Sequence, residues 1–157
     1  MKNNNIMEII VLKGERNARK TTTLKLLYSR LKKYNEKEMN QFQYIDYYNV
    51  DFVDVLVING KLIGIITFGD CFAILVQYIL VLIKIKVDLI ICACSDTDYQ
   101  DDSVEMYQSF ETLCTDNSLT KYEFEVKKDK TSVKIKTEQK CSEIISKLEE
   151  LNYLPKR

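Results

Sequence analysis

Three residues near the start of the chain, Gly14, Lys20 and Thr21, have the types and the spacing that suit binding of a phosphate chain. In the pattern G-x-x-x-x-G-K-[ST], backbone N–H groups wrap the phosphates, the lysine contacts the outer two, and the hydroxyl holds Mg²⁺. The stretch GERNARKTTTL fits this pattern except that Arg19 stands at the second glycine position. Because glycine there permits close approach of the backbone to phosphate, Arg19 either obstructs the site, points outward or adds positive charge to it.

The elements on both sides of this loop can position it. Ile6 to Leu12 is rich in Ile and Val, which is typical of a buried strand. After the loop, apolar side chains recur at helical spacing, at Leu24, Leu27, Tyr28 and Leu31. A helix that begins there directs its N-terminal N–H groups and the positive end of its dipole at the loop, which stabilises an anion.

With strand, loop and helix in this order, the chain resembles the P-loop NTPase superfamily, with a degenerate Walker A motif. It is more similar to the small nucleotide-kinase-like members than to the large motor ATPases. The resemblance implies that Gly14 makes the tight turn, Lys20 contacts the β- and γ-phosphates of ATP or GTP, and Thr21 ligates Mg²⁺. Thr22 would lie beside the α-phosphate. The expected nucleotide-binding residues are Gly14, Asn17, Ala18, Arg19, Lys20, Thr21 and Thr22.

A second carboxylate at the end of a neighbouring strand normally completes the Mg²⁺ shell of such a site. Asp70 is the first candidate, because it follows an apolar run that ends in Gly69; Asp96, after Ile90 to Cys94, is the second. Asp70 also directly precedes an apolar helix, so a capping role is the alternative there. We therefore expect Lys20 and Asp70 to be the catalytic residues, and Thr21 and Asp70 to hold the metal.

The middle of the chain predicts a hairpin, a helix and a strand. Phe52 to Thr67 contains Asn59-Gly60 between two β-branched runs, a strong signal for a hairpin with a type I′ turn. Cys71 to Ile83 predicts a buried apolar helix, too short for a membrane span. Val87 to Cys94 reads as a fully buried strand in which Cys92 and Cys94 act as small apolar residues.

The last third predicts two helices around a strand. Asp102 with Glu105 resembles a capping box that starts a helix reaching about Cys114. Tyr122, Phe124 and Val126 alternate with charged residues as in a strand with one wet face, and Val133 with Ile135 suggests a short partner strand. A helical stripe ends the chain, at Cys141, Ile144, Ile145, Leu148 and Leu151. The sum is one domain over residues 1–157, a three-layer α/β/α sandwich with a mostly parallel sheet and an antiparallel hairpin strand.

Composition excludes several classes of function. The 23 lysines and arginines balance 23 aspartates and glutamates, so the whole molecule has no basic footprint for nucleic acid. With no histidine, Ser-His-Asp and Cys-His catalysis and an ordinary zinc site are ruled out. Five cysteines without a C-x-x-C pair indicate reduced thiols and a cytoplasmic location, and no secretory signal or membrane span is expected.

Three functions are compatible with these residues. The leading one is a P-loop protein that binds ATP or GTP with magnesium and hydrolyses it weakly or not at all. The alternative is a non-enzymatic interaction protein that has lost the nucleotide. A small-molecule kinase is disfavoured, because its lid would need arginines and only a lysine run, Lys127, Lys128 and Lys130, follows the central strands. A homodimer through strand Phe52 to Ile58, if it lies at a sheet edge, is a further expectation.

Overall fold

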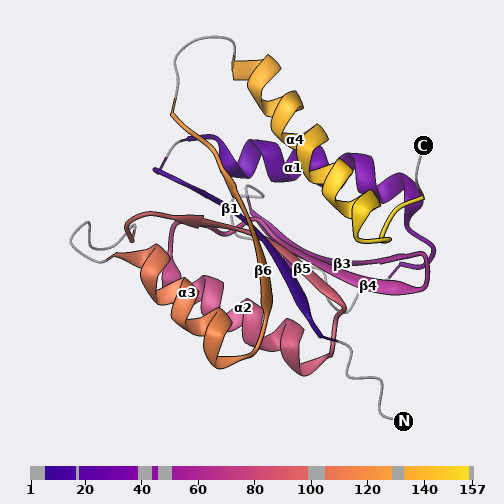
Figure 1. Ribbon diagram of the computed structural model, residues 1–157, viewed down its shortest axis with the longest axis horizontal. Helices are drawn as coiled ribbons and strands as arrows, with labels where there is room; N and C mark the ends of the chain where they lie inside the picture. The colour runs from indigo at the N-terminus through magenta and orange to yellow at the C-terminus, as the bar shows by residue number, and fades with distance from the viewer. Residues whose placement is uncertain are drawn as a thin grey trace.

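The computed structural model describes residues 6–16, 18–38, 44–45, 51–98, 105–128 and 133–155. Helices cover both faces of one mixed β-sheet (Figure 1). The strands are β1 (Glu8–Gly14), β2 (Tyr44–Ile45), β3 (Phe52–Ile58), β4 (Lys61–Ile66), β5 (Leu89–Ser95) and β6 (Thr120–Glu125). The helices are α1 (Lys20–Leu31), the 3₁₀ helix η1 (Lys32–Tyr34), α2 (Phe72–Lys84), α3 (Met106–Asp116) and α4 (Val133–Glu150).

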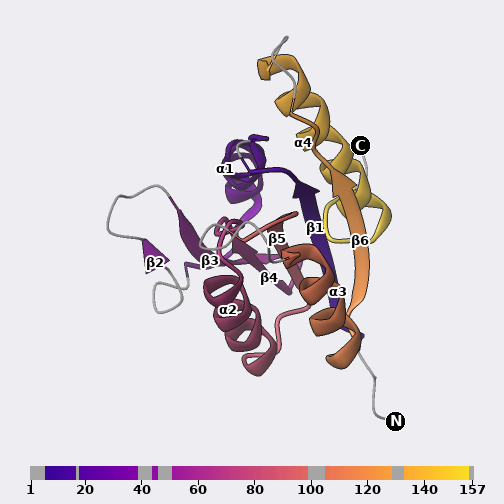
Figure 2. The same ribbon diagram turned by 90° about the vertical axis from the view of Figure 1, so that its left-hand side faces the viewer.

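The sheet has the strand order β2-β3-β4-β5-β1-β6, with β2 and β6 at its two edges (Figure 2). Strands β4, β5, β1 and β6 run parallel to one another, whereas β3 is antiparallel to both of its neighbours, β2 and β4. Helices α1 and α4 pack on one face and α2 and α3 on the other, each over its own apolar core. Every residue of β5 is buried, because helices cover both of its faces. The predicted α/β class with a mostly parallel sheet is confirmed.

The hairpin prediction is confirmed, and its turn has the expected backbone. Asn59 and Gly60 have φ of 54° and 72°, the positive values that a type I′ turn requires at both positions. The prediction that β3 is an edge strand is wrong. β2 pairs with its first residues, and further along the Val57 N–H donates to Asn35 Oδ1 at 2.8 Å while the Glu36 N–H donates to the Val57 carbonyl at 2.8 Å. The edge of β3 is therefore covered, and it offers no free strand for a second copy.

Helix α2 is buried on one side only, so the prediction of a buried helix holds for half of its surface. Leu75, Ile79 and Leu82 face the core, whereas Leu80 and Val81 are each 45% exposed. The sequence does not reveal this, because an unbroken apolar run has no periodicity that distinguishes the buried face of the helix from its exposed face. Among the described residues, no helix combines the length and apolar character that a bilayer crossing demands.

Two boundary predictions in the last third are wrong. Helix α3 begins at Met106, and Glu105 is its extended N-cap residue without a side-chain capping bond, so Glu105 does not close a capping box. Asp102, the predicted start, lies outside the described residues. Val133 and Ile135 belong to α4 rather than to a strand, because two alternating residues are too short a pattern to outweigh the helical stripe that continues from them.

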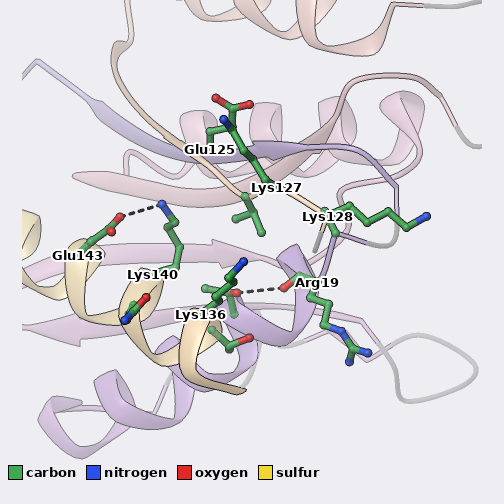
Figure 3. A pocket seen from close by; sticks show the side chains of 12 residues that line it. Arg19, Glu125, Lys127, Lys128, Lys136, Lys140 and Glu143 are labelled. Carbon is green, nitrogen blue, oxygen red and sulfur yellow. Dashed lines mark hydrogen bonds and ion pairs between the residues drawn. The ribbon is translucent and has the colours of Figure 1, made fainter. Parts of the chain in front are cut away.

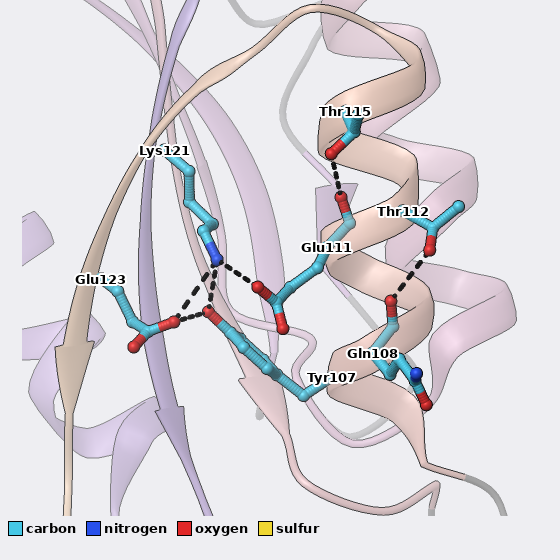
Figure 4. Close-up of polar contacts among 7 residues, drawn as sticks. All are labelled: Tyr107, Gln108, Glu111, Thr112, Thr115, Lys121 and Glu123. Carbon is cyan, nitrogen blue, oxygen red and sulfur yellow. Dashed lines mark hydrogen bonds and ion pairs between the residues drawn. The ribbon is translucent and has the colours of Figure 1, made fainter.

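A polar network joins α3 to edge strand β6 (Figure 4). The Tyr107 hydroxyl donates to the Glu123 carboxylate, and the Lys121 ammonium lies 3.1 Å from the Tyr107 hydroxyl and 2.9 Å from the Glu111 carboxylate. The hydrogen bond from Tyr107, with smaller help from Lys121, holds the pKa of Glu123 below its usual value of 4.5. The network therefore stabilises the fold most when Glu123 is ionised.

Tyr107→Phe should lower the free energy of unfolding at pH 7 by about 1 kcal/mol, because the partly buried hydrogen bond to Glu123 is lost. A carboxyl group with a lowered folded-state pKa contributes stability that is present above pH 4.5 and is lost as the pH falls through the folded-state pKa. The difference between the native protein and the variant should therefore shrink at pH 3. Urea unfolding at both pH values measures it, with Tyr34→Phe, at a 48% exposed tyrosine, as the control. An equal difference at both pH values would contradict this.

Candidate functional site at the carboxyl edge of the sheet

The β1–α1 loop lies where two adjacent parallel strands send the chain to opposite faces. β1 leads to α1 on one face, and its neighbour β5 leads to α3 on the other. Such a switch of direction opens a crevice at the carboxyl ends of the strands, where ligands of open α/β sheets bind. Gly14 and Ser95 are register partners there, and the Asp96 N–H donates to the Gly14 carbonyl at 3.1 Å.

Gly14 is needed at this position because another strand end comes very close. A Cβ atom at residue 14 would collide with the carbonyl oxygen of Val126. The Val126 N–H donates to the Lys13 carbonyl at 2.8 Å, which holds the two segments at this spacing. Among the described glycines, only Gly60 has a positive φ. Gly14, the last residue of β1, does not. Close packing, rather than a left-handed turn, therefore requires glycine at residue 14.

Arg19 takes the backbone conformation that a glycine adopts without strain. Its φ and ψ are 71° and 32°, in the left-handed region, and it is the N-cap residue of α1. Its carbonyl oxygen accepts hydrogen bonds from the Thr23 N–H at 3.1 Å and the Thr23 hydroxyl at 3.0 Å, which begin the helix. Within the described part of the chain, its exposed guanidinium has no hydrogen-bonding or ion-pairing partner. Arg19 thus adopts the left-handed backbone conformation that favours glycine.

Arg19→Gly should raise the free energy of unfolding by up to about 1 kcal/mol. A left-handed conformation costs an L-residue roughly 1–2 kcal/mol, of which the greater freedom of glycine in the unfolded chain offsets a part. Chemical denaturation of the native protein, of Arg19→Gly and of Arg19→Ala measures this. Arg19→Ala is the matched control, because it removes the same side chain and keeps the strain. A variant Arg19→Gly that is less stable than Arg19→Ala would contradict the expectation.

Lys20 is a nearly buried cation inside the loop. Its side chain is 4% exposed, and its ammonium donates to the Glu15 carbonyl at 2.6 Å, across the loop. Burial lowers the pKa of Lys20, and the negative charges of Asp70 and Asp96 oppose that shift. A cation with so little water around it gains from a nearby anion, because the anion replaces lost hydration.

Five of the predicted residues meet around one cavity, which we call the loop cavity. Its volume is 310 Å³, and it is lined by Arg19, Lys20, Thr21, Thr22 and Asp70. All of these are residues that the sequence marks as candidates. Arg19 and the first turn of α1 supply one wall, and the segment between β4 and α2 supplies Asp70.

Asp70 is not the cap residue of helix α2. Its carboxylate accepts a hydrogen bond from the Ser95 hydroxyl, at the end of the neighbouring strand β5. The N-cap residue of α2 is Cys71, which makes no side-chain capping bond, so the capping alternative for Asp70 is wrong. The Thr21 hydroxyl lies 3.4 Å from the Thr67 carbonyl, three residues before Asp70. Ser95 carries no sequence signal beyond ending a buried run, and it becomes recognisable only once β5 lies between β4 and β1.

The oxygen donors at this edge suit Mg²⁺. Thr21 and Asp70 line the loop cavity, and Asp96 contributes a buried Oδ1 atom that has no hydrogen-bond partner in the described part of the chain. The described part of the chain contains no group of three or more acidic, cysteine or histidine side chains that could hold a metal ion by themselves. This set fits Mg²⁺, which usually binds through one or two carboxylates together with substrate phosphates and water.

Not every predicted residue lies in the loop cavity. Gly14, the last residue of β1, does not line it, and Asn17 lies outside the described residues. Ala18 is 4% exposed and lines a second cavity, which adjoins the first at Arg19. All five cysteines are free, and burial raises the pKa of Cys92 and Cys94, as expected for apolar core residues.

The second cavity, which we call the lysine cavity, lies between the β1–α1 loop, the end of β6 and the first turns of α4 (Figure 3). Its volume is 350 Å³. The charged side chains that line it are Arg19, Glu125, Lys127, Lys128, Lys136, Lys140 and Glu143. Lys127 and Lys128, from the lysine run considered as a lid, line this cavity together with residues of α4; Lys130 lies outside the described residues.

Comparison with known proteins does not assign this site. No family model, no curated protein and no solved structure matches the chain. The geometry at the carboxyl ends of β1, β4 and β5 is therefore the ground on which a function can be proposed.

Proposed function

We propose that the chain binds a nucleoside triphosphate, ATP or GTP, together with Mg²⁺, through the β1–α1 loop. The observation that carries this proposal is the loop cavity, whose entire lining consists of Arg19, Lys20, Thr21, Thr22 and Asp70. Backbone N–H groups at the start of α1, the dehydrated Lys20 ammonium and the helix dipole all favour a polyphosphate there. The fold would then be that of a P-loop NTPase with arginine at the second glycine position.

The two adjoining cavities suit the two parts of such a ligand. The triphosphate occupies the loop cavity, and the nucleoside occupies the lysine cavity beyond Arg19, where Ala18 and Val126 provide an apolar surface. Thr21 and Asp70 hold the metal ion, which neutralises phosphate charge, and Ser95 orients Asp70 by its hydrogen bond. Asp96 stands at the same strand end, near Lys20.

Hydrolysis is weak or absent in this proposal. Transfer of a phosphoryl group needs positive charge arranged around the transition state, commonly from arginines on a closing segment. Of the described arginines, Arg16, Arg19 and Arg30, Arg19 alone lines either cavity, and Arg30 points to Cys141 on α4.

The five free cysteines support the cytoplasmic location expected from the sequence.

Calorimetric titration tests the proposal with ATP and GTP, each with and without Mg²⁺. We expect saturable binding of at least one nucleotide, and we expect that binding to weaken in Asp70→Asn more when Mg²⁺ is present than when it is absent. The alternative, an interaction protein that has lost the nucleotide, predicts no binding by the native protein. A release of phosphate at the rate of an ordinary kinase or motor ATPase would overturn the weak-hydrolysis part alone.

A further inference from the structure

Strand β6 leaves one edge of the sheet open. It is the last strand in the sheet order, and its one neighbour among the described strands is β1 (Figure 2). The N–H groups of Thr120 and Val126 donate toward β1, at 3.0 and 2.8 Å. Because backbone groups alternate in direction along a strand, those of Lys121 and Glu123 point away from β1. The part of the chain that the structure describes holds no partner for these outward groups.

The two edges of the sheet differ in what they offer a further strand. The edge strand β2 has two residues, whereas β6 has six. A very short edge strand is protected against pairing, and a longer one is a template for it. A groove of 480 Å³ lies between residues 121–124 of β6 and Glu143, Ser146, Lys147 and Glu150 on α4. Helix α4 therefore leaves room for an extended strand beside β6.

The side chains of β6 suit pairing with a second β6. In an antiparallel pair about a two-fold axis at Tyr122, Lys121 of each copy lies directly opposite Glu123 of the other. The backbone groups of both residues point outward, so each such pair exchanges two N–H···O=C bonds across the axis. Tyr122 then faces Tyr122 of the second copy on the α4 side of the sheet, and aromatic pairs between strands are stabilising.

Charge favours this register over the two nearest alternatives that keep the faces of the sheet aligned. An axis at Glu123 would place its two carboxylates directly opposite each other, and an axis at Lys121 would do the same with two ammonium groups. Like charges in that position are destabilising. The Lys121 ammonium already lies 2.9 Å from the Glu111 carboxylate and 3.4 Å from that of Glu123 in its own chain (Figure 4). It is therefore on the face of the sheet where Glu123 of the second copy would lie.

We propose that the chain forms a homodimer in which two β6 strands pair antiparallel about an axis at Tyr122 and join the two sheets into one. The homodimer does not depend on the proposed nucleotide, because no residue of β6 lines the loop cavity. One strand and the adjoining helix make a small interface, so we expect a dissociation constant in the micromolar range. Sedimentation velocity without nucleotide should show monomer converting to dimer between about 1 and 300 μM protein.

Two charge exchanges test the register. Lys121→Glu places glutamate opposite Glu123 of the second copy, and Glu123→Lys places lysine opposite Lys121. Each variant alone should therefore associate at least about tenfold more weakly than the native protein. An equal mixture of the two regains every pair of opposite charges and should form a heterodimer with nearly native affinity. Lys134→Glu is the control for net charge, because Lys134 is an exposed lysine of α4 outside the groove, and it should associate as the native protein does.

Hydrogen exchange of the native protein provides a test that needs no variant. The backbone N–H groups of Lys121 and Glu123 should exchange more slowly as the protein concentration rises, whereas that of Tyr122, which points toward β1, should change less. A native protein that stays monomeric over the whole range would overturn the proposal. A dimer whose Lys121 and Glu123 N–H groups gain no protection would also overturn it, as would two variants that are folded by thermal unfolding yet fail to pair.

Discussion

Lys20→Ala is expected to weaken binding of the Mg²⁺-nucleoside triphosphate by about 10- to 150-fold, the equivalent of one charge-assisted contact worth roughly 1.5–3 kcal/mol. The Lys20 ammonium is buried beside the loop cavity, is bonded to the Glu15 carbonyl, and lies within electrostatic reach of Asp70 and Asp96. A phosphate chain in the cavity takes the place of its missing hydration. Calorimetric titration of the native and variant proteins with the same nucleotide measures the change.

The controls separate lost binding from lost folding. Lys25→Ala removes a lysine from the same helix, at a position that lines neither cavity, and should leave the affinity unchanged. Lys20→Met keeps most of the buried aliphatic volume and should bind as weakly as Lys20→Ala, because the charge is missing in both. If Lys20→Met bound nucleotide as tightly as the native protein, the ammonium would have no part in the site.

Gly14→Ala is expected to have the largest effect on stability, a loss of about 2–3 kcal/mol in the free energy of unfolding. The new methyl group would collide with the carbonyl oxygen of Val126, which is backbone and is held by the hydrogen bond from its own N–H to the Lys13 carbonyl. Relief requires the end of β6 to move away from β1. For a chain of this size, thermal unfolding should shift down by roughly 5–10 °C.

Gly60→Ala supplies the contrast for that measurement. Nothing lies within 4 Å of a Cβ added at Gly60, but its φ is 72°, so only backbone strain opposes the substitution. We expect a loss of about 1 kcal/mol there, smaller than at Gly14. Equal losses at both sites would mean that conformational freedom, rather than the contact with Val126, explains the glycine in the loop.

The local elements could be predicted because their signals lie within short windows. Strand β1, helix α1, the hairpin with its Asn59-Gly60 turn, buried strand β5 and the last helix all follow from periodicity and turn residues. The failures also have local causes. Val133 and Ile135 form too short a pattern, and the uniformly apolar run of α2 conceals which face contacts the sheet.

The loop cavity could be anticipated in part for the same reason. Arg19, Lys20, Thr21 and Thr22 are consecutive, so one loop and the first turn of a helix bring them together. Asp70 is distant in sequence, but its place after a strand predicts it as part of the site, because parallel strands end at one edge of the sheet. Its hydrogen bond from Ser95 depends on β5 lying next to β4, which strand patterns do not reveal.

The sequence by itself determined the α/β class, the strand–loop–helix unit and the chemistry of the residues around Lys20. Only the tertiary structure decided the strand order, the contact of Val126 with Gly14, the covered edge of β3 and the cavity between the end of β6 and α4. Local propensity and the hydrogen bonds of helices and turns act between near neighbours in the chain. These local signals do not distinguish buried strands that have similar apolar patterns. The order of the strands therefore depends on pairing and packing between segments that are far apart in the sequence.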